Sequence, residues 1–167
     1  ALGILAATQQ VPAGPLEAPL VTSAFSGSED LVFDGTGGIV GKDGGNLVRV
    51  DASDAKTTIA AVSGQSFGVR YGSDGALFVA QPQSGQLLRV EGSTVTTHLT
   101  GLSGPNGVYG DFAGNVYVTE FSGNQIIRVD VGSSNFDVIV DGSPASQPNG
   151  VVLDDERGLL FFTNYSQ

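Results

Sequence analysis

One stretch of sequence is repeated four times along this 167-residue chain, and the fourth copy is incomplete. The second residue of the copies is in turn Glu29, Phe67, Asn106 and Asn149, so successive copies begin 38, 39 and 43 residues apart. A period of about 40 residues built from short strands and glycine-rich turns is typical of β-propeller blades. The repeat therefore predicts the fold, and the residues that differ between copies indicate where a site lies.

The third copy, which opens with Pro105, Asn106 and Gly107, shows best how one unit is built. Runs of β-branched and aromatic residues alternate with turns of Gly, Asn and Asp, a pattern that predicts strands joined by hairpins. Four strands are expected in this unit, at residues 108–111, 116–120, 125–130 and 136–140. Along the whole chain, inner strands are expected to start near residues 30, 68, 107 and 150, with no long helix.

A count of the expected strands indicates that the chain does not close a propeller by itself. Residues 20–25 have the pattern of an outer strand that precedes three complete four-stranded units, and the fourth unit contributes only residues 151–154 and 159–163. A radial array of sheets must close to cover its edges. We therefore expect an N-terminal extension at residues 1–19 and, at residues 20–167, the N-terminal portion of a single propeller domain that another chain completes.

Several charged residues recur in phase or lie in turns, and we expect them to be structural. The third strands carry in-phase arginines, Arg49, Arg89 and Arg128. Their recurrence favours cross-strand ladder residues. The turns that follow the inner strands hold the carboxylates Asp34, Asp111, Asp154 and Asp155, as is usual for turns. The only histidine, His98, falls on an outer strand, and a surface position is expected for it.

Composition narrows the classes of partner. The chain has 17 Asp and Glu residues against 7 Lys and Arg, and its net charge is −10. This balance argues against nucleic acid and anionic membranes as partners, because both need a cationic face. The chain has no Cys, so disulfides and thiolate metal sites are excluded.

The amino-terminal residues bear on the compartment. The chain does not begin with Met, which indicates processing or trimming. The apolar residues 1–7 could be the tail of a removed export signal, and a periplasmic or secreted protein is then expected. An ordinary apolar N terminus is the alternative. No stretch approaches the length of a transmembrane span.

The order and phase of the motifs resemble one family of propellers. Pro-Asn-Gly at residues 105–107, followed by an apolar strand, an Asp turn and Val-Tyr-Val-Thr-Glu at residues 116–120, is similar to the six-bladed propellers of the gluconolactonase and regucalcin superfamily. Residues 27–31 resemble the first blade of paraoxonases, and residues 66–80 resemble the second blade of strictosidine synthase-like proteins. The resemblance covers residues 20–167 and implies an all-β, six-bladed β-propeller, of which this chain supplies about three and a half blades.

Such relatives hold one divalent cation, usually calcium, on the propeller axis, and the resemblance implies that Glu29, Asn106 and Asn149 are its ligands here. The chemistry agrees, because in-phase residues at the starts of inner strands point into one channel. A carboxylate with two amide oxygens suits calcium or magnesium rather than zinc. A further carboxylate is expected from blades outside this chain. In the equivalent place, Phe67 offers no ligand and is expected to line an apolar pocket.

Two other interpretations stay open at these positions. Both Asn-Gly pairs could be plain turns, since this is a common turn sequence, and Glu29 could merely cap a loop. Asp30 could serve a second calcium ion, as in paraoxonases. However, Gly107 stands where those proteins use a carboxylate, so a second ion is not expected.

The ends of the second strands give a second set of polar residues, namely Lys42, Gln81, Glu120 and Asn164. Because these strands run back to the face that carries Glu29, we expect the four side chains to border the mouth of the pocket. A solvated rim is the alternative. Glu120 is the best candidate for a general base, Lys42 for an anion partner, and Asn164 for a further pocket residue.

The leading functional prediction is a metal-dependent hydrolase of lactones or esters that acts on a small-molecule substrate. The cation would polarise the carbonyl and help to orient or deprotonate water, with Glu29 and Glu120 as the catalytic residues. Two alternatives stay open. One is a strictosidine synthase-like enzyme or lyase without a catalytic metal, and the other is a non-enzymatic propeller that binds protein.

The fourth unit stops inside the hairpin that follows its second strand, at residues 164–167. An unpaired apolar strand at residues 159–163 would be an exposed sheet edge. We therefore expect a second polypeptide of about 100 to 150 residues that begins with the missing third strand and stays bound without disulfides. If the break is a maturation cut, the new amino terminus of this partner could supply a Ser, Thr or Cys nucleophile. Accidental proteolysis of the hairpin is the alternative.

Overall fold

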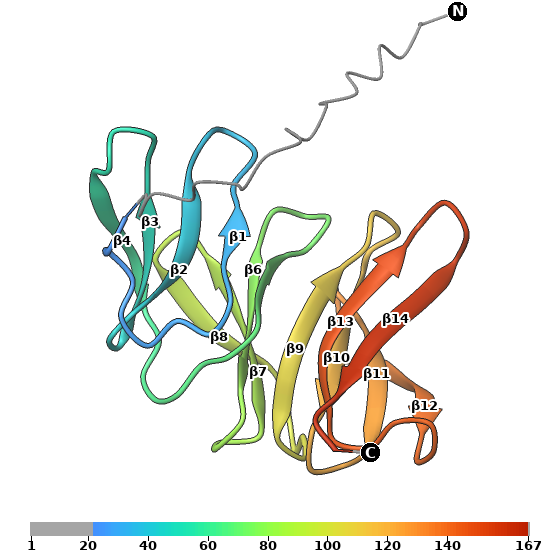
Figure 1. Ribbon diagram of the computed structural model, residues 1–167. Helices are drawn as coiled ribbons and strands as arrows, with labels where there is room; N and C mark the ends of the chain where they lie inside the picture. Colours follow the sequence, from blue (N-terminus) through green and yellow to red (C-terminus); the bar gives the residue numbers. More distant parts are fainter. Residues whose placement is uncertain (1–21, 167) are drawn as a thin grey trace, which may run out of the picture.

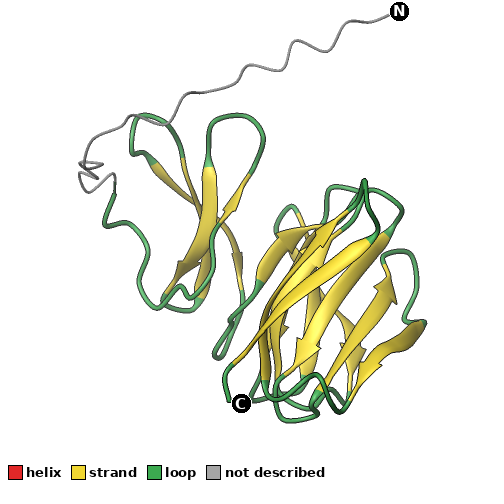
Figure 2. Ribbon diagram, turned by 45° about the vertical axis from the view of Figure 1, so that its right-hand side comes forward, coloured by secondary structure: helices red, strands yellow, loops and turns green. Residues whose placement is uncertain are grey.

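The computed structural model describes residues 22–166 of the chain. Within this range the chain is all β, with fourteen strands in four antiparallel sheets (Figure 1). Strands and the loops that join them account for the whole of this range (Figure 2). Among these residues there is no helix long and apolar enough to cross a membrane.

Each sheet is a blade, and the blades are numbered here in chain order. Blade 1 consists of β1 (Val32–Phe33), β2 (Ile39–Asp43), β3 (Asn46–Val50) and β4 (Lys56–Ala61). Blade 2 consists of β5 (Val69–Tyr71), β6 (Leu77–Gln81), β7 (Gln86–Glu91) and β8 (Thr94–Thr100). Blade 3 consists of β9 (Pro105–Gly110), β10 (Asn115–Glu120), β11 (Gln125–Asp130) and β12 (Phe136–Asp141). Blade 4 has two strands in the described range, β13 (Pro148–Asp154) and β14 (Leu159–Asn164).

The repeat in the sequence predicted this architecture correctly. In every blade, strands that are neighbours in the chain are neighbours in the sheet, which is the up-and-down order of propeller blades. The inner strands begin at Val32, Val69, Pro105 and Pro148, each within two residues of the expected start. The fold prediction of three complete blades and a partial fourth is confirmed.

The prediction of an outer strand at residues 20–25 is wrong for residues 22–25, the part of this segment that the structure describes. Residues 22–25 form no strand, and residues 20 and 21 lie outside the described range. The chain instead meets the end of β2 at Ser26, which forms one parallel bridge with Asp43. The reason is that β1 is only two residues long and pairs with β2 no further than Val40. The inner edge of β2 is thus left for Ser26, whose backbone N–H donates to the oxygen of Lys42 at 3.2 Å.

The core consists of two apolar layers between adjacent blades. The strand β6 is buried along its whole length, and its side chains alternate between the two layers as the period of a strand requires. Leu77 and Val79 belong to the layer shared with blade 1, while Phe78 and Ala80 belong to the layer shared with blade 3. Complete burial of a Phe side chain is worth about 2–3 kcal/mol, so blade-to-blade packing stabilises the fold.

The in-phase arginines are structural, as predicted. Arg49 pairs with Asp34 and Arg89 pairs with Asp74, in both cases at 2.5 Å. These two carboxylates lie in the turns between inner and second strands, so each pair ties a turn to a third strand. Arg128 differs, because it pairs instead with Asp137 of the adjacent strand β12, also at 2.5 Å.

His98 lies between two blades. Its Nε2 atom is 2.9 Å from the backbone oxygen of Asp130 in blade 3, and its ring meets the ring of Phe78 edge-on at 5.0 Å. The hydroxyl of Ser134 donates to the backbone oxygen of His98 at 2.8 Å. His98 is therefore half-buried and links blades 2 and 3, a more specific structural place than the surface position that was expected.

Candidate functional site

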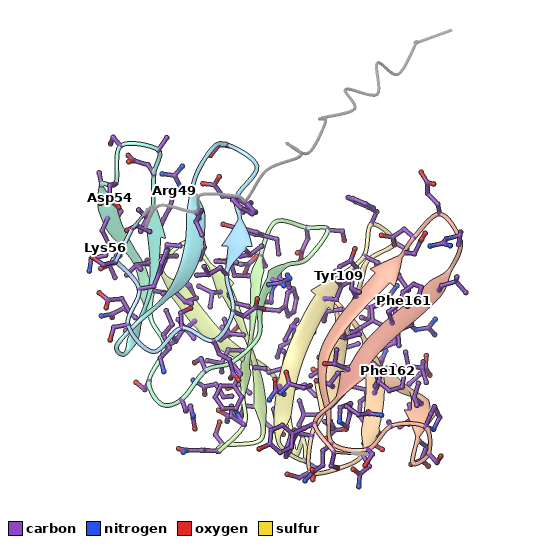
Figure 3. The ribbon with its side chains drawn as sticks, viewed as in Figure 1. Arg49, Asp54, Lys56, Tyr109, Phe161 and Phe162 are labelled. Carbon is purple, nitrogen blue, oxygen red and sulfur yellow. The ribbon has the colours of Figure 1, made fainter. Side chains whose placement is uncertain are left out.

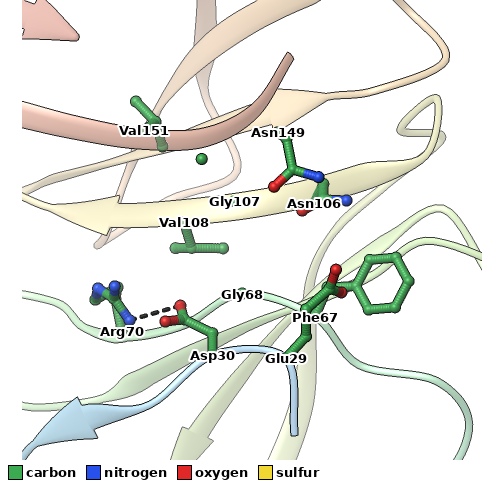
Figure 4. A pocket seen from close by; sticks show the side chains of 11 residues that line it. Glu29, Asp30, Phe67, Gly68, Arg70, Asn106, Gly107, Val108, Asn149 and Val151 are labelled. Carbon is green, nitrogen blue, oxygen red and sulfur yellow. Dashed lines mark hydrogen bonds and ion pairs between the residues drawn. The ribbon is translucent and has the colours of Figure 1, made fainter. Parts of the chain in front are cut away.

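The four in-phase residues at the starts of the inner strands face one cavity. Glu29, Phe67, Asn106 and Asn149 line a cavity of about 150 Å³. Figure 4 shows these side chains at one end of the cavity and the pair of Asp30 and Arg70 at the other. Blades that are far apart in the sequence thus contribute one residue each to a common place near the inner strands.

Close contact between inner strands holds these residues together. The backbone N–H of Gly68 donates to the backbone oxygen of Asn106 at 2.8 Å. The hydroxyl of Thr119 accepts a hydrogen bond from the N–H of Gly107 at 2.7 Å and donates to the backbone oxygen of Asn149 at 2.6 Å. The backbone oxygens of Asn106 and Asn149 accept hydrogen bonds, and the side-chain amides of both residues face the cavity.

The two Asn-Gly pairs are not turns. Asn106 and Gly107 lie inside β9, and Asn149 and Gly150 lie inside β13. Asn106 is buried, with 7% of its surface exposed. The interpretation of these pairs as plain turns is therefore wrong, and the interpretation as strand residues that face the axis agrees with the structure.

Asp30 is engaged in holding two blades together. Its Oδ2 atom is 2.5 Å from Nη1 of Arg70 and accepts a hydrogen bond from the N–H of Val69 at 3.2 Å. Its Oδ1 atom accepts a hydrogen bond from the N–H of Leu31 at 2.9 Å. Both oxygens of this carboxylate have protein partners, so Asp30 ties the end of blade 1 to the inner strand of blade 2.

Within residues 22–166, Glu29 forms no ion pair. Partial burial raises its pKa above the ordinary value of 4.5, and the neighbouring Asp30 carboxylate raises it further. A cation beside Glu29 would reverse this effect, because an opposite charge nearby favours the ionised form. One carboxylate and two amide oxygens are hard donors of the kind that calcium takes, so these residues fit such an ion.

The described residues do not form a complete metal site. No group of three or more His, Cys, Asp or Glu side chains that could hold a metal occurs within residues 22–166. Calcium takes six to eight oxygen ligands in general, and Glu29, Asn106 and Asn149 offer three side chains. Any ion on this axis would need further ligands from water or from other blades.

A second, wider cavity opens above the first. It measures about 330 Å³ and shares Glu29, Phe67, Asn106 and Asn149 with the first cavity. The other residues around it are mostly apolar or uncharged, namely Gln65, Pro82, Gln83, Gly104, Phe121, Ser122 and Tyr165. The rings of Phe121 and Tyr165 lie 5.5 Å apart at a tilt of 59°. We call this wider cavity the mouth.

The sequence analysis missed Phe121 and Tyr165. Both residues follow directly after the last residue of a second strand, Glu120 in β10 and Asn164 in β14. The sequence could have indicated them, because both are aromatic and both occupy the first position of the hairpin after a second strand.

The residues at the ends of the second strands anchor loops in this structure. Glu120 is buried, and its carboxylate accepts hydrogen bonds from the backbone N–H of Ser103 at 2.5 Å and from the side-chain amide of Gln125. The side-chain amide of Gln81 donates to the oxygen of Ser63, also at 2.5 Å. The bonds to Ser103 and Ser63 each tie the loop that leads into an inner strand to the second strand of the same blade, and the bond to Gln125 joins β10 to β11.

Asn164 and Lys42 take part in the same kind of bond. The Oδ1 atom of Asn164 accepts from the N–H of Ser146 at 3.0 Å, and Nζ of Lys42 donates to the oxygen of Gly64 at 2.9 Å. Glu120, Lys42 and Asn164 are not among the residues that line the two cavities described above. Their roles as general base, anion partner and pocket residue stay predictions.

Lys42 is also out of phase with the other three. Strand pairing sets Gln81 opposite Gln86 and Glu120 opposite Gln125. In blade 1 the corresponding pair is Asp43 and Asn46. Asp43 therefore occupies the place that the sequence analysis gave to Lys42, and Lys42 lies one residue earlier, on the opposite face of its strand.

No protein-family model and no curated protein matches the sequence. Solved structures match by shape. Virginiamycin B lyase from Staphylococcus aureus is similar with a TM-score of 0.71 over 90% of this chain and 51% of that chain, at 15% identity. A gluconolactonase from Xanthomonas campestris gives a TM-score of 0.69 over 82% of this chain and 54% of that chain, at 16% identity. A chain of the nidogen/laminin complex gives a TM-score of 0.73, with 82% and 56% coverage and 20% identity.

These likenesses show the fold and no more, because the identities are low. The chain spans about half the length of the solved structures that it matches. The fold of the chain is thus that of about half of a six-bladed β-propeller, as found in gluconolactonases and in virginiamycin B lyase.

Proposed function

We propose that this chain supplies the metal-binding half of a propeller hydrolase that acts on lactones or esters. The observation that carries the proposal is the convergence of Glu29, Asn106 and Asn149 on one cavity beneath an apolar mouth. A gluconolactonase and a luciferin-regenerating enzyme are among the solved structures of similar shape, which supports an enzyme of this class.

The residues would divide the work of the site. Glu29, Asn106 and Asn149 would hold a calcium ion by their side-chain oxygens, and a bound ion of this kind polarises a carbonyl and stabilises the oxyanion that forms from it. Phe67 lies beside these three residues in both cavities. Its half-buried ring offers an apolar surface beside the exposed carboxylate of Glu29.

The mouth indicates the kind of substrate. Phe67, Phe121 and Tyr165 give it three aromatic rings, and among the described residues Glu29 is the only charged one that lines it. Aromatic side chains bind flat apolar groups well, whereas a sugar acid would need many polar partners. We therefore expect a lactone or ester that carries an apolar ring or acyl chain, and faster hydrolysis of a ring-fused aromatic lactone than of a sugar lactone.

Calcium titration followed by NMR tests the metal site directly. We expect the side-chain amide resonances of Asn106 and Asn149 to shift as calcium is added, since their oxygens become ligands. Glu29→Gln should weaken binding by about tenfold or more, because it removes the only carboxylate among the three side chains. Glu156→Gln, in an exposed turn of blade 4, is the matched control. Equal calcium affinity in Glu29→Gln and Glu156→Gln would overturn the assignment.

A non-enzymatic binding propeller is the second candidate. It is favoured by one observation, which is that the mouth presents no carboxylate besides Glu29 and no histidine among its described residues. A chain of the nidogen/laminin complex has a similar shape. If calcium binds but no lactone or ester is hydrolysed by the closed propeller, this candidate replaces the hydrolase.

Completion by further blades is part of the proposal. The chain spans about half of its structural neighbours, and the remaining metal ligands would come from a second polypeptide that closes the ring. A periplasmic or extracellular location also stays a proposal. The residues on which it rests, 1–7, lie outside the described range.

A further inference from the structure

Glu29 differs from Asn106 and Asn149 in how the fold holds its backbone. The two asparagines lie inside β9 and β13, and strand pairing continues on both sides of each of them. Glu29 lies three residues before β1 and belongs to no strand. Contacts other than strand pairing must therefore fix the main chain at Glu29.

The next residue, Asp30, departs from the repeat. Its equivalents in the other blades are glycines, namely Gly68, Gly107 and Gly150. In blade 2 the glycine lets two inner strands touch, because the N–H of Gly68 donates to the backbone oxygen of Asn106 at 2.8 Å. A Cβ atom on Gly68 would lie 2.5 Å from that same oxygen. A residue with a side chain at this place requires a different contact between the blades.

The carboxylate of Asp30 makes that contact with blade 2. Its Oδ2 atom is 2.5 Å from Nη1 of Arg70 and accepts a hydrogen bond from the N–H of Val69 at 3.2 Å. The same nitrogen of Arg70 donates to the backbone oxygens of Leu31 and Val69, at 3.0 and 2.7 Å. Arg70 thus holds both the side chain of Asp30 and the main chain that follows it.

Arg70 is itself a departure from the repeat. Strand pairing makes Tyr109 of β9, labelled in Figure 3, and Val152 of β13 its equivalents. Neither of these residues carries a positive charge. The blade with a carboxylate in place of glycine is therefore followed by the blade with a guanidinium in place of a neutral side chain, and the two departures act as one pair.

Ser28 holds the main chain on the other side of Glu29. Its hydroxyl donates to the backbone oxygen of Asp30 at 2.7 Å and accepts a hydrogen bond from the N–H of Lys42 in β2 at 3.0 Å. The chain is thus tied to blade 1 at residue 28 and to blade 2 at residue 30. Glu29 lies between these two ties, and its side chain faces the end of the cavity opposite to the Asp30–Arg70 pair (Figure 4).

We propose that Asp30 and Arg70 are positioning residues for Glu29, and that their pair fixes the place of this carboxylate relative to Asn106 and Asn149. The pair acts through the backbone of residues 29–31. It also keeps the guanidinium of Arg70 at the far end of the cavity, so that the carboxylate of Glu29 stays available to a cation. The inference rests on the proposed calcium site and adds what holds its carboxylate ligand.

Charge and geometry make opposite predictions for the loss of Arg70. A guanidinium repels a calcium ion, so by charge alone its removal strengthens calcium binding. Loss of the pair frees the backbone at residues 29–31, and calcium binding then has to order this segment, which lowers the affinity. Weaker calcium binding after the removal of a positive charge is therefore specific to a positioning role.

Arg70→Met removes the charge and keeps much of the volume of the side chain. We expect its calcium affinity, measured by isothermal titration calorimetry, to fall about tenfold, in line with the cost of ordering one residue. Arg49→Met is the matched control. Arg49 of β3 (Figure 3) also forms a 2.5 Å pair with an aspartate, its side chain is 33% exposed against 30% for Arg70, and it lines neither cavity. Arg49→Met should bind calcium as tightly as the unmodified protein or slightly more tightly.

A second measurement needs no calcium. With a chelator present, the backbone N–H of Glu29 should have an NMR order parameter of about 0.85, as in rigid backbone, and Arg70→Met should lower it below about 0.6. Arg49→Met should leave it unchanged. If Arg70→Met does not fold, as judged by urea unfolding, Asp30→Asn has nearly the shape of the native residue, lacks the ion pair and should lower the same order parameter.

Two outcomes would overturn the proposal. One is an order parameter of Glu29 that stays at the native value in the folded variant. The other is a calcium affinity of Arg70→Met equal to or above that of Arg49→Met. If the unmodified protein bound no calcium while Glu29 became mobile in Arg70→Met, the positioning of Glu29 would hold and the proposed calcium site would fail, so the two results are distinguishable.

Discussion

At the scale of single residues, the carboxylate of Asp111 in a turn and the carboxylate of Glu29 at the cavity have opposite surroundings. Asp111 is 5% exposed, and its Oδ1 atom accepts hydrogen bonds from the N–H groups of Ala113 and Asn115 at 2.9 and 2.8 Å. Glu29 lies against a cavity, and the residues beside it raise its pKa rather than lower it. The carboxylate of Asp111 stabilises a turn, whereas Glu29 lines the cavity.

Asp111 offers a test of acid stability. Burial alone would raise its pKa, but hydrogen bonds from Asn115 and Ala113 outweigh burial and hold the pKa below the usual 3.8. A lowered pKa in the folded state stabilises the protein above the unfolded pKa, and this stabilisation is lost as the pH falls through the folded pKa. We expect Asp111→Ala to lower the free energy of unfolding by about 2 kcal/mol at pH 7 and by less at pH 3, as measured in urea.

Asp155→Ala is the control for this prediction, because Asp155 is an exposed residue of the corresponding turn in blade 4. It should change the free energy of unfolding little at either pH. If the deficit of Asp111→Ala were as large at pH 3 as at pH 7, the ionised carboxylate would not be the group that stabilises this turn.

At the residue scale, the repeat indicated which residues line a common cavity where it keeps its phase, and their roles there stay predictions. Asn106 and Asn149 are each the second residue of an inner strand and Glu29 lies three residues before β1, and all three line one cavity. Lys42 was assigned one residue off because hairpin length varies. Only Gly44 and Gly45 lie between β2 and β3, whereas four residues lie between β10 and β11. Hairpin length follows turn type, which the repeat alone does not determine.

At the scale of elements, glycines set how closely the inner strands approach. A Cβ atom on Gly107 would lie 2.3 Å from the backbone oxygen of Asn149 in the next blade. The equivalent atom on Gly150 would meet only the hydroxyl of Thr163, at 3.3 Å. The strands β9 and β13 approach each other so closely that position 107 of the earlier strand must be glycine. The same close approach brings Asn106 and Asn149 near each other.

These two glycines form a matched pair of mutations. Gly107→Ala should destabilise the protein by about 2–3 kcal/mol, because backbone atoms must move to admit the methyl group. It should also disturb the side-chain amide resonances of Asn106 and Asn149. In the 167-residue chain by itself, Gly150→Ala should cost less than about 1 kcal/mol, since a hydroxyl can shift by a few tenths of an ångström. Thermal unfolding checks both, and a similar loss in the two variants would contradict the proposed role of the close approach of β9 and β13.

The elements themselves could be predicted from sequence with one exception. Strands that carry the repeat were found within two residues of their observed starts. The exception is the segment at residues 22–25, which was expected to be part of an outer strand and forms no strand. Its place is set by an edge left open at the end of β2, and this is a tertiary effect that local pattern does not contain.

At the scale of the whole molecule, the axis cavity and the outward face of blade 4 would both be completed by the remaining blades of a propeller. The axis cavity offers the side-chain oxygens of three residues, and a calcium ion would need more ligands. On the face of blade 4, the aromatic side chain of Phe161 is 49% exposed among the described residues. Both are explained if the chain is about half of a closed six-bladed ring, the length relation that the solved structures show.

Native mass spectrometry of the protein purified without chelator or denaturant tests this account most directly. The account predicts that the chain occurs in an assembly of about twice its 17.0 kDa mass that carries one calcium ion per propeller, and that Glu29→Gln keeps the assembly but loses the ion. A stable monomer of 17.0 kDa that binds no calcium would contradict it.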